Sequence, residues 1–410
     1  MAQIAGRAIL PRMASRRIRR TDAPCIVGMQ KMMEEFDSKD TISLAQGIVY
    51  WKPPEKALKR AADAVYTSES SMYGADGGIT ELRDRLREKV RTENKLIQSD
   101  IMVTTGANQA FTNVVLTLCD VDDDVVLFPP YYFNHMMAFQ MTGVKNILLG
   151  ERHPQTFQPS SKWIEETLKA NEKVKVVVIT NPCNPTGVLT PLNELKKISE
   201  LCQQYGCWLV LDNTYEYFVY GEGNEGHSTI EGEHILNIFS FSKAYGMMGW
   251  RCGYIAFVDS QAGGKWSLGS ELLKAQDTIP ICPPIISQYV ALGALEAGKE
   301  WVTNKINEDV IKNRNLVREC LISTLGEHNV YGGDGAIYFF AKLPDAYKDD
   351  VKVVRYIAEK YGVVIIPGTA CGYPGYVRVS YANLTHAKFS EGVDRLKLGL
   401  SDIVKNQPKL

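Results

Sequence analysis

One lysine, Lys243, lies in a stretch of small, aromatic and glycine residues. The apolar residues 235–239 come just before it and are typical of a buried strand. Burial favours the neutral amine, and a neutral amine attacks carbonyl groups. Ser240, Ser242 and Arg251 supply hydroxyl and guanidinium donors that suit a phosphate monoester. A lysine that can bond an aldehyde beside a phosphate site indicates pyridoxal 5'-phosphate; the alternative is a surface lysine in a glycine-rich loop.

Two turns that follow predicted strands offer groups for the same cofactor. Ala107 and Asn108 open a helix after the strand 101–105, and their free backbone N–H groups suit a phosphate. Asn184 lies in the turn at 181–187, where two prolines and a glycine hold its amide ready to donate to a phenolate oxygen. Ligands bind outside the carboxyl ends of strands in an open parallel sheet. The alternative for each segment is a turn without a ligand.

Two charged residues are associated with predicted strands. Asp212 ends an apolar strand, where a buried carboxylate needs a partner. A protonated pyridine nitrogen would be that partner and would make the ring an electron sink; the alternative is a helix cap. Arg378 lies in the alternating strand 376–381, between valines that face the other way. It is predicted either to clamp a substrate carboxylate at two points or to be a solvated arginine on the sheet.

Strands and helices alternate through the first two thirds of the chain. We expect strands at 101–105, 125–128, 174–180, 208–212, 235–240 and 253–257, with helices such as 107–119 and 192–205 between them. This order predicts an α/β fold with a mostly parallel sheet covered by helices. A long helix with apolar residues from 302 to 321, strands at 336–343, 363–366 and 376–381, and a helix at 351–361 predict a smaller α+β domain.

Four segments are therefore predicted. They are a basic N-terminal tail at 1–22, an arm on the small-domain side at 23–45, a large cofactor-binding domain at 46–290 and a small C-terminal domain at 291–410. The first twenty residues contain six arginines and no acidic residue, as in an organelle transit peptide. Because the segment is short and poor in serine, we expect a disordered tail and a cytoplasmic protein, with an organelle as the alternative.

Composition argues against several classes of protein. The 410 residues are 45% hydrophobic and 23% charged, and the net charge of −1 gives no electrostatic reason to expect nucleic acid or membrane as a partner. No apolar run approaches the ~20 residues of a membrane span. Nine scattered cysteines without a C-x-x-C pair indicate reduced thiols. The stretch 221–226 matches the dinucleotide pattern G-x-G-x-x-G, but no apolar helix follows it, so a surface loop is predicted.

The segment FSFSKAYGMMGWR around Lys243 resembles the cofactor-lysine segment of class I/II aminotransferases of fold type I. The chain from about Ser43 onward resembles this family, since SLAQGIVYWKPP, GANQAF, PPYYFNHMMAFQMTGV and DNTYEYF also match in order. The combination is most similar to plant-type aromatic amino acid and methionine aminotransferases. The resemblance implies transfer of an amino group between an aromatic amino acid or methionine and a 2-oxo acid, such as an aromatic one. It also implies a homodimer with shared active sites.

The resemblance implies a role for each matching residue. Lys243, Asp212 and Tyr215 are expected to be catalytic. The cofactor is expected to contact Ala107, Asn108, Tyr132, Asn184, Asp212, Tyr215, Ser240, Ser242, Lys243 and Arg251, together with Tyr73 of the neighbouring subunit. Substrate is expected to contact Gly47, Asn184 and Arg378, and no metal site is expected. His135 stands where many relatives have tyrosine, and it is expected either to contact substrate or to be a packed neutral histidine.

Substrate choice depends on weaker signals. Tyr50, Trp51, Tyr131 and Phe133 are aromatic residues near the matching motifs and are compatible with an aromatic substrate. No second arginine can be assigned to the side-chain carboxylate of a dicarboxylic substrate. An aspartate- or kynurenine-type aminotransferase, or a carbon–sulfur lyase that uses the same cofactor, is the alternative.

Overall fold

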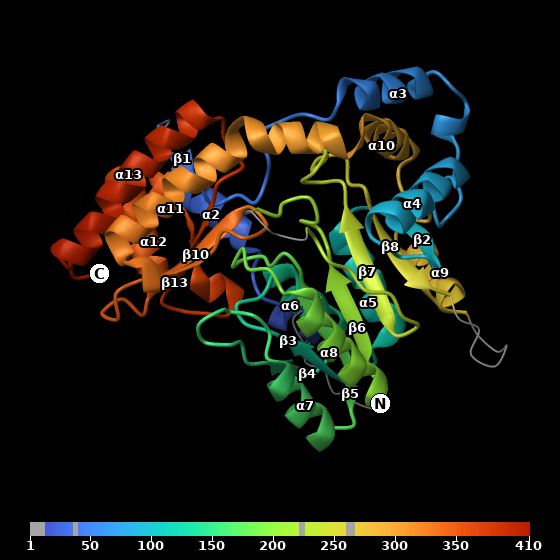
Figure 1. The fold of residues 1–410 in the computed structure, drawn as a ribbon, viewed down its shortest axis with the longest axis horizontal. Helices are drawn as coiled ribbons and strands as arrows, with labels where there is room; N and C mark the ends of the chain where they lie inside the picture. The colour runs from blue at the N-terminus through green and yellow to red at the C-terminus, as the bar shows by residue number, and fades with distance from the viewer. Residues whose placement is uncertain (1–12, 36–39, 221–225, 260–266) are drawn as a thin grey trace, which may run out of the picture.

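The computed structural model describes residues 13–35, 40–220, 226–259 and 267–410. Its largest sheet has seven strands in the order β2-β8-β7-β6-β5-β3-β4 (Figure 1). They are β2 (Ser99–Thr104), β3 (Asp124–Leu127), β4 (Asn146–Leu149), β5 (Val174–Thr180), β6 (Trp208–Asp212), β7 (Ile235–Ser240) and β8 (Gly253–Val258). β8 runs antiparallel to β2 and β7, and the other neighbours are parallel. The predicted α/β fold with a mostly parallel sheet is confirmed.

Helices cover both faces of this sheet. Those on one face are α5 (Ala107–Leu118), α6 (Phe133–Thr142) and α9 (Leu268–Thr278), and those on the other include α7 (Ser161–Ala170) and α8 (Leu192–Gln204). On β5, Val176 and Val178 pack into the first of these buried clusters, whereas Val177 and Ile179 pack into the second. Strands that are buried on both faces have continuous apolar sequences, which is why they could be located from sequence.

A second sheet has the order β12-β13-β10-β9 and is antiparallel throughout. Its strands are β9 (Val330–Gly332), β10 (Tyr338–Lys342), β12 (Ile366–Pro367) and β13 (Tyr376–Ser380), and the helices beside it are α11 (Ile311–Leu325), α12 (Asp350–Tyr361) and α13 (His386–Lys405) (Figure 1). The prediction of one strand at 363–366 is wrong. β11 (Val363–Val364) pairs instead with β1 (Ile42–Ser43), which attaches the N-terminal arm to this part of the chain.

The long helical stretch between the two sheets is interrupted twice. Gly298, with φ 76°, breaks the helical path of α10 (Ile285–Lys305), and a π-helical turn, Ile306–Val310, joins α10 to α11. The helix predicted across 302–321 is therefore present but contains this turn. The predicted domain boundary at residue 290 falls inside α10. Upstream, α3 (Glu55–Val65) packs closely on α10, where a Cβ at Gly293 would meet the backbone of Ala57.

The remaining elements are short or belong to the N-terminal region. They are α1 (Arg16–Arg20), α2 (Cys25–Glu35), α4 (Thr80–Glu93) and the 3-10 turns Glu69–Ser71, Glu327–Asn329 and Gly368–Cys371. The prediction of a wholly disordered tail is wrong for α1, whose N-terminus is capped by the Ser15 hydroxyl. After α1, the backbone N–H of Asp22 donates to Gln140 on α6. Residues 1–12 of the predicted tail and 221–225 of the predicted surface loop lie outside the described residues.

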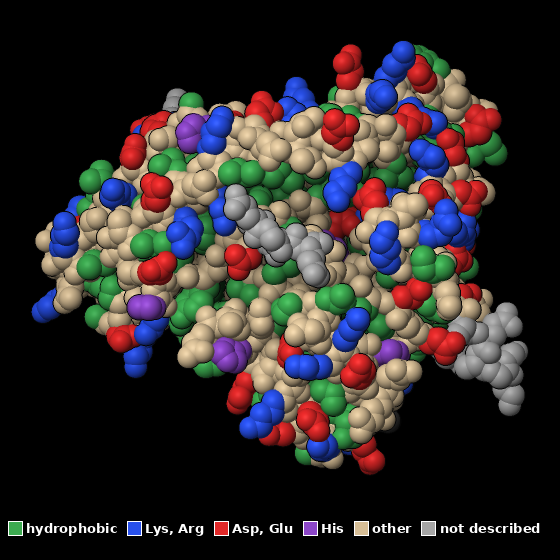
Figure 2. Space-filling view, in the orientation of Figure 1, with side chains coloured by type: hydrophobic (Ala, Val, Ile, Leu, Met, Phe, Trp, Pro, Cys, Tyr) green, Lys and Arg blue, Asp and Glu red, His purple; other side chains and the backbone are tan. Residues whose placement is uncertain are grey.

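Acidic and basic side chains are interspersed on the face seen in Figure 2, and they form no large patch of one charge there. Among the described residues, no helix combines the length and apolar character needed to cross a membrane. The same residues contain no group of three histidine, cysteine or acidic side chains placed to hold a metal ion. All nine cysteines are free thiols.

Candidate active site

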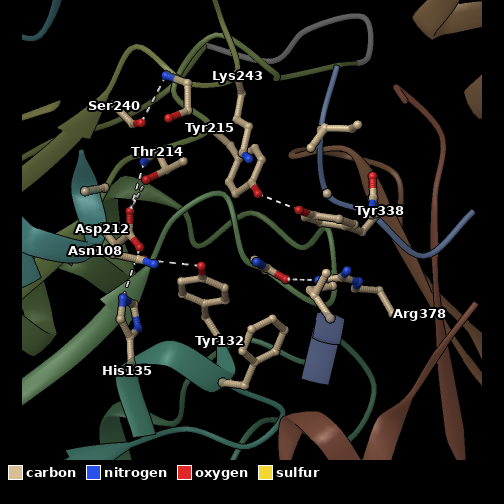
Figure 3. A pocket seen from close by; sticks show the side chains of 18 of the residues that line it. Asn108, Tyr132, His135, Asp212, Thr214, Tyr215, Ser240, Lys243, Tyr338 and Arg378 are labelled. Atoms are coloured by element: carbon tan, nitrogen blue, oxygen red, sulfur yellow. Dashed lines mark hydrogen bonds and ion pairs between the residues drawn. The ribbon is translucent and has the colours of Figure 1, made fainter. Parts of the chain in front are cut away.

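A cavity of about 320 Å³ lies at the carboxyl ends of β5, β6 and β7 (Figure 3). Small-molecule sites usually have volumes of roughly 300–1,000 Å³. Every predicted site residue except Tyr73 lines it, namely Gly47, Ala107, Asn108, Tyr132, Asn184, Asp212, Tyr215, Ser240, Ser242, Lys243, Arg251 and Arg378. Tyr73 is 82% exposed and lines a separate surface hollow. Segments from the whole length of the chain therefore meet at one place.

Lys243 projects into this cavity from the turn after β7 (Figure 3). Burial lowers the pKa of its amine to about 8; Arg251 and Arg378 add to this effect and Asp212 opposes it. Part of the amine is therefore neutral near pH 7, as a nucleophile requires. The turn is tightly packed, since Gly246 has φ 64° and a Cβ there would lie 2.5 Å from the carbonyl oxygen of Trp51. The alternative of a lysine in a loose surface loop is wrong.

The end of the cavity beside α5 collects hydrogen-bond donors. Ala107 and Asn108 form the first turn of α5, where backbone N–H groups have no partner within the helix. The Arg251 guanidinium packs against Gly106, at which a Cβ would overlap it, and is held by donation to the Met248 carbonyl oxygen at 3.0 Å. Ser240 and Ser242 complete this set: their hydroxyls line the same cavity. Such a combination of helix N-terminus, hydroxyls and guanidinium suits a phosphate group.

Asp212 is held as a carboxylate at the end of β6. Its Oδ1 accepts from the backbone N–H and the hydroxyl of Thr214, at 3.0 and 2.7 Å, and its Oδ2 lies 3.1 Å from Nε2 of His135. Burial raises the pKa of Asp212, but the contacts with His135 and Thr214 outweigh burial and the pKa is lowered. The buried carboxylate thus stays ionised beside the cavity. The contact with Thr214 resembles the predicted cap, although no α-helix starts there.

His135 was predicted either to contact substrate or to pack as a neutral side chain. It is buried, and its ring packs at a tilt against Phe111 with 4.1 Å between the ring centroids, as the second alternative expects, but it also lines the cavity, so the first alternative stays open. Sequence reasoning missed its bond to Asp212. Helix α6 brings His135 to Asp212 from 77 residues earlier in the chain, and no local pattern indicates such a contact.

Arg378 is 1% exposed, so the alternative of a solvated arginine is wrong. Its guanidinium donates to Oδ1 of Asn184 at 2.9 Å and to the carbonyl oxygen of Ala45 at 2.6 Å. It also lies over the ring of Tyr338, 4.3 Å from the centroid, and its Nε–H is buried without a partner. Among the described residues no carboxylate pairs with it, although buried arginines are usually paired. An incoming carboxylate would supply the missing charge and acceptor.

The last polar groups come from Asn184 and Tyr215. Asn184 uses its amide oxygen for Arg378, so its N–H groups are the part available to a ligand. The Tyr215 hydroxyl lies 2.5 Å from the hydroxyl of Tyr338, and either can be the donor. Burial is the main reason that the pKa of Tyr215 is raised well above its ordinary value. Tyr338 was not predicted as a site residue, because it belongs to a strand without a recognisable motif.

One wall of the cavity is aromatic and aliphatic. Ile26, Ile48 and Phe133 contribute apolar surface, and the hydroxyl of Tyr132 donates to Oδ1 of Asn108 at 3.2 Å. Of the four aromatic residues predicted near the pocket, only Phe133 is among the lining residues. Tyr50, Trp51 and Tyr131 are not among them, and Trp51 is instead fixed by a bond to the Ala244 carbonyl oxygen.

The residues of this cavity fit pyridoxal 5'-phosphate. One end offers a phosphate-type donor set, Lys243 has a lowered pKa, and Asp212 is an ionised carboxylate suited to a protonated ring nitrogen. Asn184 and Tyr215 bring an amide and a hydroxyl to the same space, which suits a phenolate oxygen. The buried, unpaired Nε–H of Arg378 then fits the carboxylate of a substrate.

Comparison with known proteins agrees with this fit. The family model for aminotransferase class I and II matches residues 39–396. The chain is 49% identical to the aromatic aminotransferase ISS1 of Arabidopsis thaliana over 393 residues. This alignment covers 96% of this chain and 97% of that protein. It is also 32% identical over 376 residues to a probable aspartate/prephenate aminotransferase of Aquifex aeolicus, and this alignment covers 89% of this chain and 92% of that protein.

Solved structures show the same fold. A double mutant of the aspartate aminotransferase of Thermus thermophilus matches with a TM-score of 0.85 and 25% sequence identity, over 95% of this chain and 100% of that one. The chain therefore belongs to the class I and II aminotransferases of fold type I, and it is a pyridoxal-phosphate-dependent transaminase that acts on amino acids and 2-oxo acids.

Proposed function

We propose that this transaminase exchanges the amino group of an aromatic amino acid or methionine with a 2-oxo acid, such as an aromatic one. The observation that carries the proposal is the distribution of charge in the cavity. Among the described lining residues the cations are Lys243, Arg251 and Arg378, and each has a proposed task at the cofactor or the substrate α-carboxylate. None is left for the side-chain carboxylate of a substrate. A relative named aromatic aminotransferase, 49% identical, supports the same substrate class.

The apolar wall favours such side chains. Burial of an aromatic ring or a thioether against Ile26, Ile48 and Phe133 contributes roughly 1.5–3 kcal/mol. A carboxylate in the same place would lose its hydration without gaining a cation, at a cost of several kcal/mol. Aspartate is therefore expected to be a poor substrate, although several relatives at lower identity are named aspartate aminotransferases.

Three residues that line the cavity have distinct tasks in the proposed reaction. When bound, pyridoxal phosphate supplies an aldehyde that takes up the amino group and a ring that delocalises the electron pair left by the α-proton. Arg378 holds the substrate carboxylate, which orients the α-carbon toward Lys243. The amine of Lys243, with its pKa near 8, takes the α-proton and returns it as an acid. Asp212 balances the charge of the ring nitrogen and stabilises the developing negative charge.

The other predicted residues would bind the cofactor. Ala107, Asn108, Ser240, Ser242 and Arg251 would hold its phosphate. Tyr132 would stack on its ring, and Asn184 and Tyr215 would donate to its phenolate oxygen. Gly47 would lie beside the substrate.

We also propose a homodimer in which Tyr73 reaches the phosphate of the partner subunit's site. Tyr73 is 82% exposed, Met72 next to it in the chain is 67% exposed, and Tyr66 earlier in the same segment is 92% exposed. Such a group of exposed apolar side chains is typical of a protein interface.

Nine free thiols support a reducing compartment. We place the enzyme in the cytoplasm, with an organelle as the alternative if the arginine-rich N-terminus is a transit peptide.

A panel of donors and acceptors tests the substrate class. The purified enzyme with pyridoxal phosphate is given methionine, phenylalanine, tryptophan, kynurenine or aspartate, each with an aromatic 2-oxo acid or 2-oxoglutarate, and both products are measured by mass spectrometry. Methionine and the aromatic donors should have the highest kcat/KM. A value for aspartate or kynurenine that equals or exceeds theirs would contradict the proposal. Release of ammonia, a thiol and 2-oxobutyrate from methionine, without amination of the acceptor, would indicate a lyase.

A further inference from the structure

Tyr338 contacts two residues of the active site that come from different sheets (Figure 3). It belongs to β10 of the antiparallel sheet and is 1% exposed. Its hydroxyl lies 2.5 Å from the hydroxyl of Tyr215, which follows β6 of the large sheet. Its ring lies under the guanidinium of Arg378, 4.3 Å from the centroid. One phenol thus links the carboxylate-binding arginine to a hydroxyl of the cofactor site.

We propose that Tyr338 is a positioning residue that donates its hydroxyl hydrogen to Tyr215 and so leaves the Tyr215 hydrogen free for the cofactor. This proposal rests on the proposed contact of Tyr215 with the cofactor. Two hydroxyl oxygens at this separation share one hydrogen, so one group donates and the other must direct its own hydrogen elsewhere. The direction of that bond decides whether Tyr215 can donate into the cavity.

The position of Arg378 favours Tyr338 as the donor. A cation over the face of a phenol stabilises the negative charge that builds on the oxygen as it gives up its hydrogen. Burial is the main cause that raises the pKa of each hydroxyl, and at Tyr338 the nearby Arg378 is the largest effect that opposes this rise. The more acidic hydroxyl is the better donor. Tyr338 therefore donates, and Tyr215 accepts.

Gly47 leaves the space that the Tyr338 hydroxyl occupies. A Cβ at Gly47 would overlap the Tyr338 hydroxyl, and the next nearest atoms belong to the same ring. The phenol is thus pressed against the backbone of the N-terminal segment on one side and against Arg378 on the other. The missing side chain of Gly47 makes room for Tyr338, which gives this glycine a second role beside its predicted one at the substrate.

A hydroxyl that accepts a hydrogen bond becomes a stronger donor itself, because bonds in a chain polarise one another. Tyr215 should therefore stabilise a negative oxygen on the cofactor better with Tyr338 than without it. The expected consequence is a lower pH midpoint for the change in absorption of the cofactor bound at Lys243. This midpoint is a property of the resting holoenzyme, and it is measured without substrate.

The test compares absorption against pH for the holoenzyme and three variants. Tyr338→Phe removes the hydroxyl but keeps the ring under Arg378, and it should raise the midpoint by about 0.1–0.6 pH unit, since polarisation strengthens the bond from Tyr215 by only a fraction of its value. Tyr215→Phe should raise it further. The Tyr215→Phe/Tyr338→Phe double variant should match Tyr215→Phe alone, because Tyr338 acts through Tyr215. KM should change little in Tyr338→Phe, since Arg378 keeps its aromatic contact.

Tyr381→Phe is a matched control. Tyr381 is buried and its hydroxyl donates to the Ala336 carbonyl oxygen at 3.1 Å, but it does not line the cavity. It reports the effect of losing a buried hydroxyl near β10, and its midpoint should equal that of the wild type. Incorporation of 3-fluorotyrosine at position 338 provides a second variant with the same shape and a more acidic hydroxyl, and it should lower the midpoint.

The outcomes separate this proposal from the function on which it rests. A shift in Tyr215→Phe with none in Tyr338→Phe or with 3-fluorotyrosine would overturn only the role of Tyr338. A Tyr338→Phe shift that persists in the Tyr215→Phe background would also overturn it, because Tyr338 would then act directly. An unchanged pH midpoint in Tyr215→Phe would overturn both the proposed contact of Tyr215 with the cofactor and this inference. The proposed substrate class does not depend on these variants, because the donor panel alone tests it.

Discussion

Replacing Arg378 by lysine tests how the enzyme holds the group common to all its substrates. The guanidinium is fixed by bonds to Asn184 and Ala45, and its Nε–H is left for a ligand. Lysine keeps the charge but loses the planar fork, so two-point binding of a carboxylate becomes one-point binding. One hydrogen bond to a charged group contributes about 1.5–3 kcal/mol. At about 1.4 kcal/mol per factor of ten, KM should rise by roughly 10- to 150-fold.

The rise should affect amino acids and 2-oxo acids alike, because both carry the carboxylate that Arg378 is proposed to bind. Steady-state kinetics with each substrate varied in turn measure it. Arg314→Lys is the control: Arg314 also lies over a tyrosine ring, at 5.3 Å from the centroid of Tyr220, and donates to the Gly333 carbonyl oxygen, but it does not line the cavity. A change in KM for one substrate only would place Arg378 at the side-chain pocket, and no change for either would refute the clamp.

Two further predictions concern the cofactor. Asp212→Ala should lower kcat by orders of magnitude with the fold preserved, as judged by circular dichroism, because the ring nitrogen loses its counter-charge; kcat within a few-fold of the wild type would leave Asp212 only its structural contacts with Thr214 and His135. In the cofactor-free protein, the pKa of about 8 means that the reactive neutral form of Lys243 increases as the pH rises through 8. Brief exposure to pyridoxal phosphate, borohydride reduction and peptide mapping should give a labelling midpoint near that pH, whereas a midpoint near 10.5 or a label on another lysine would contradict the assignment.

Much of the site could be predicted because its residues follow apolar strands. Asp212 ends β6, and Asn184 and Lys243 follow β5 and β7; these strands are buried on both faces and are nearly continuous in apolar residues. The carboxyl ends of parallel strands lie at one edge, so three separate stretches of sequence point to one place. Arg378 was predicted with two alternatives, since an alternating strand does not reveal which of its faces is buried.

Pairing between distant residues could not be predicted. Tyr215 and Tyr338 are 123 residues apart, and Asn184 and Arg378 are 194 apart. Periodicity and turn residues report local structure, whereas these bonds depend on how the second sheet and the N-terminal segment are placed against the first. For the same reason Trp51, which is near Gly47 in sequence, was expected near the pocket but does not line it; it bonds to the Ala244 carbonyl oxygen and stacks on Phe218 instead.

The buried state of Arg378 is the point at which stability and function conflict. A guanidinium at 1% exposure loses its hydration, and among the described residues it gains only neutral acceptors and an aromatic ring in return. An apolar residue at this position of β13 would suit the core of the free chain better. The arginine makes physical sense once a carboxylate ligand is included, because the ligand then supplies both the missing charge and the acceptor for Nε. This conflict is our reason for proposing that Arg378 binds the substrate α-carboxylate rather than having a structural role.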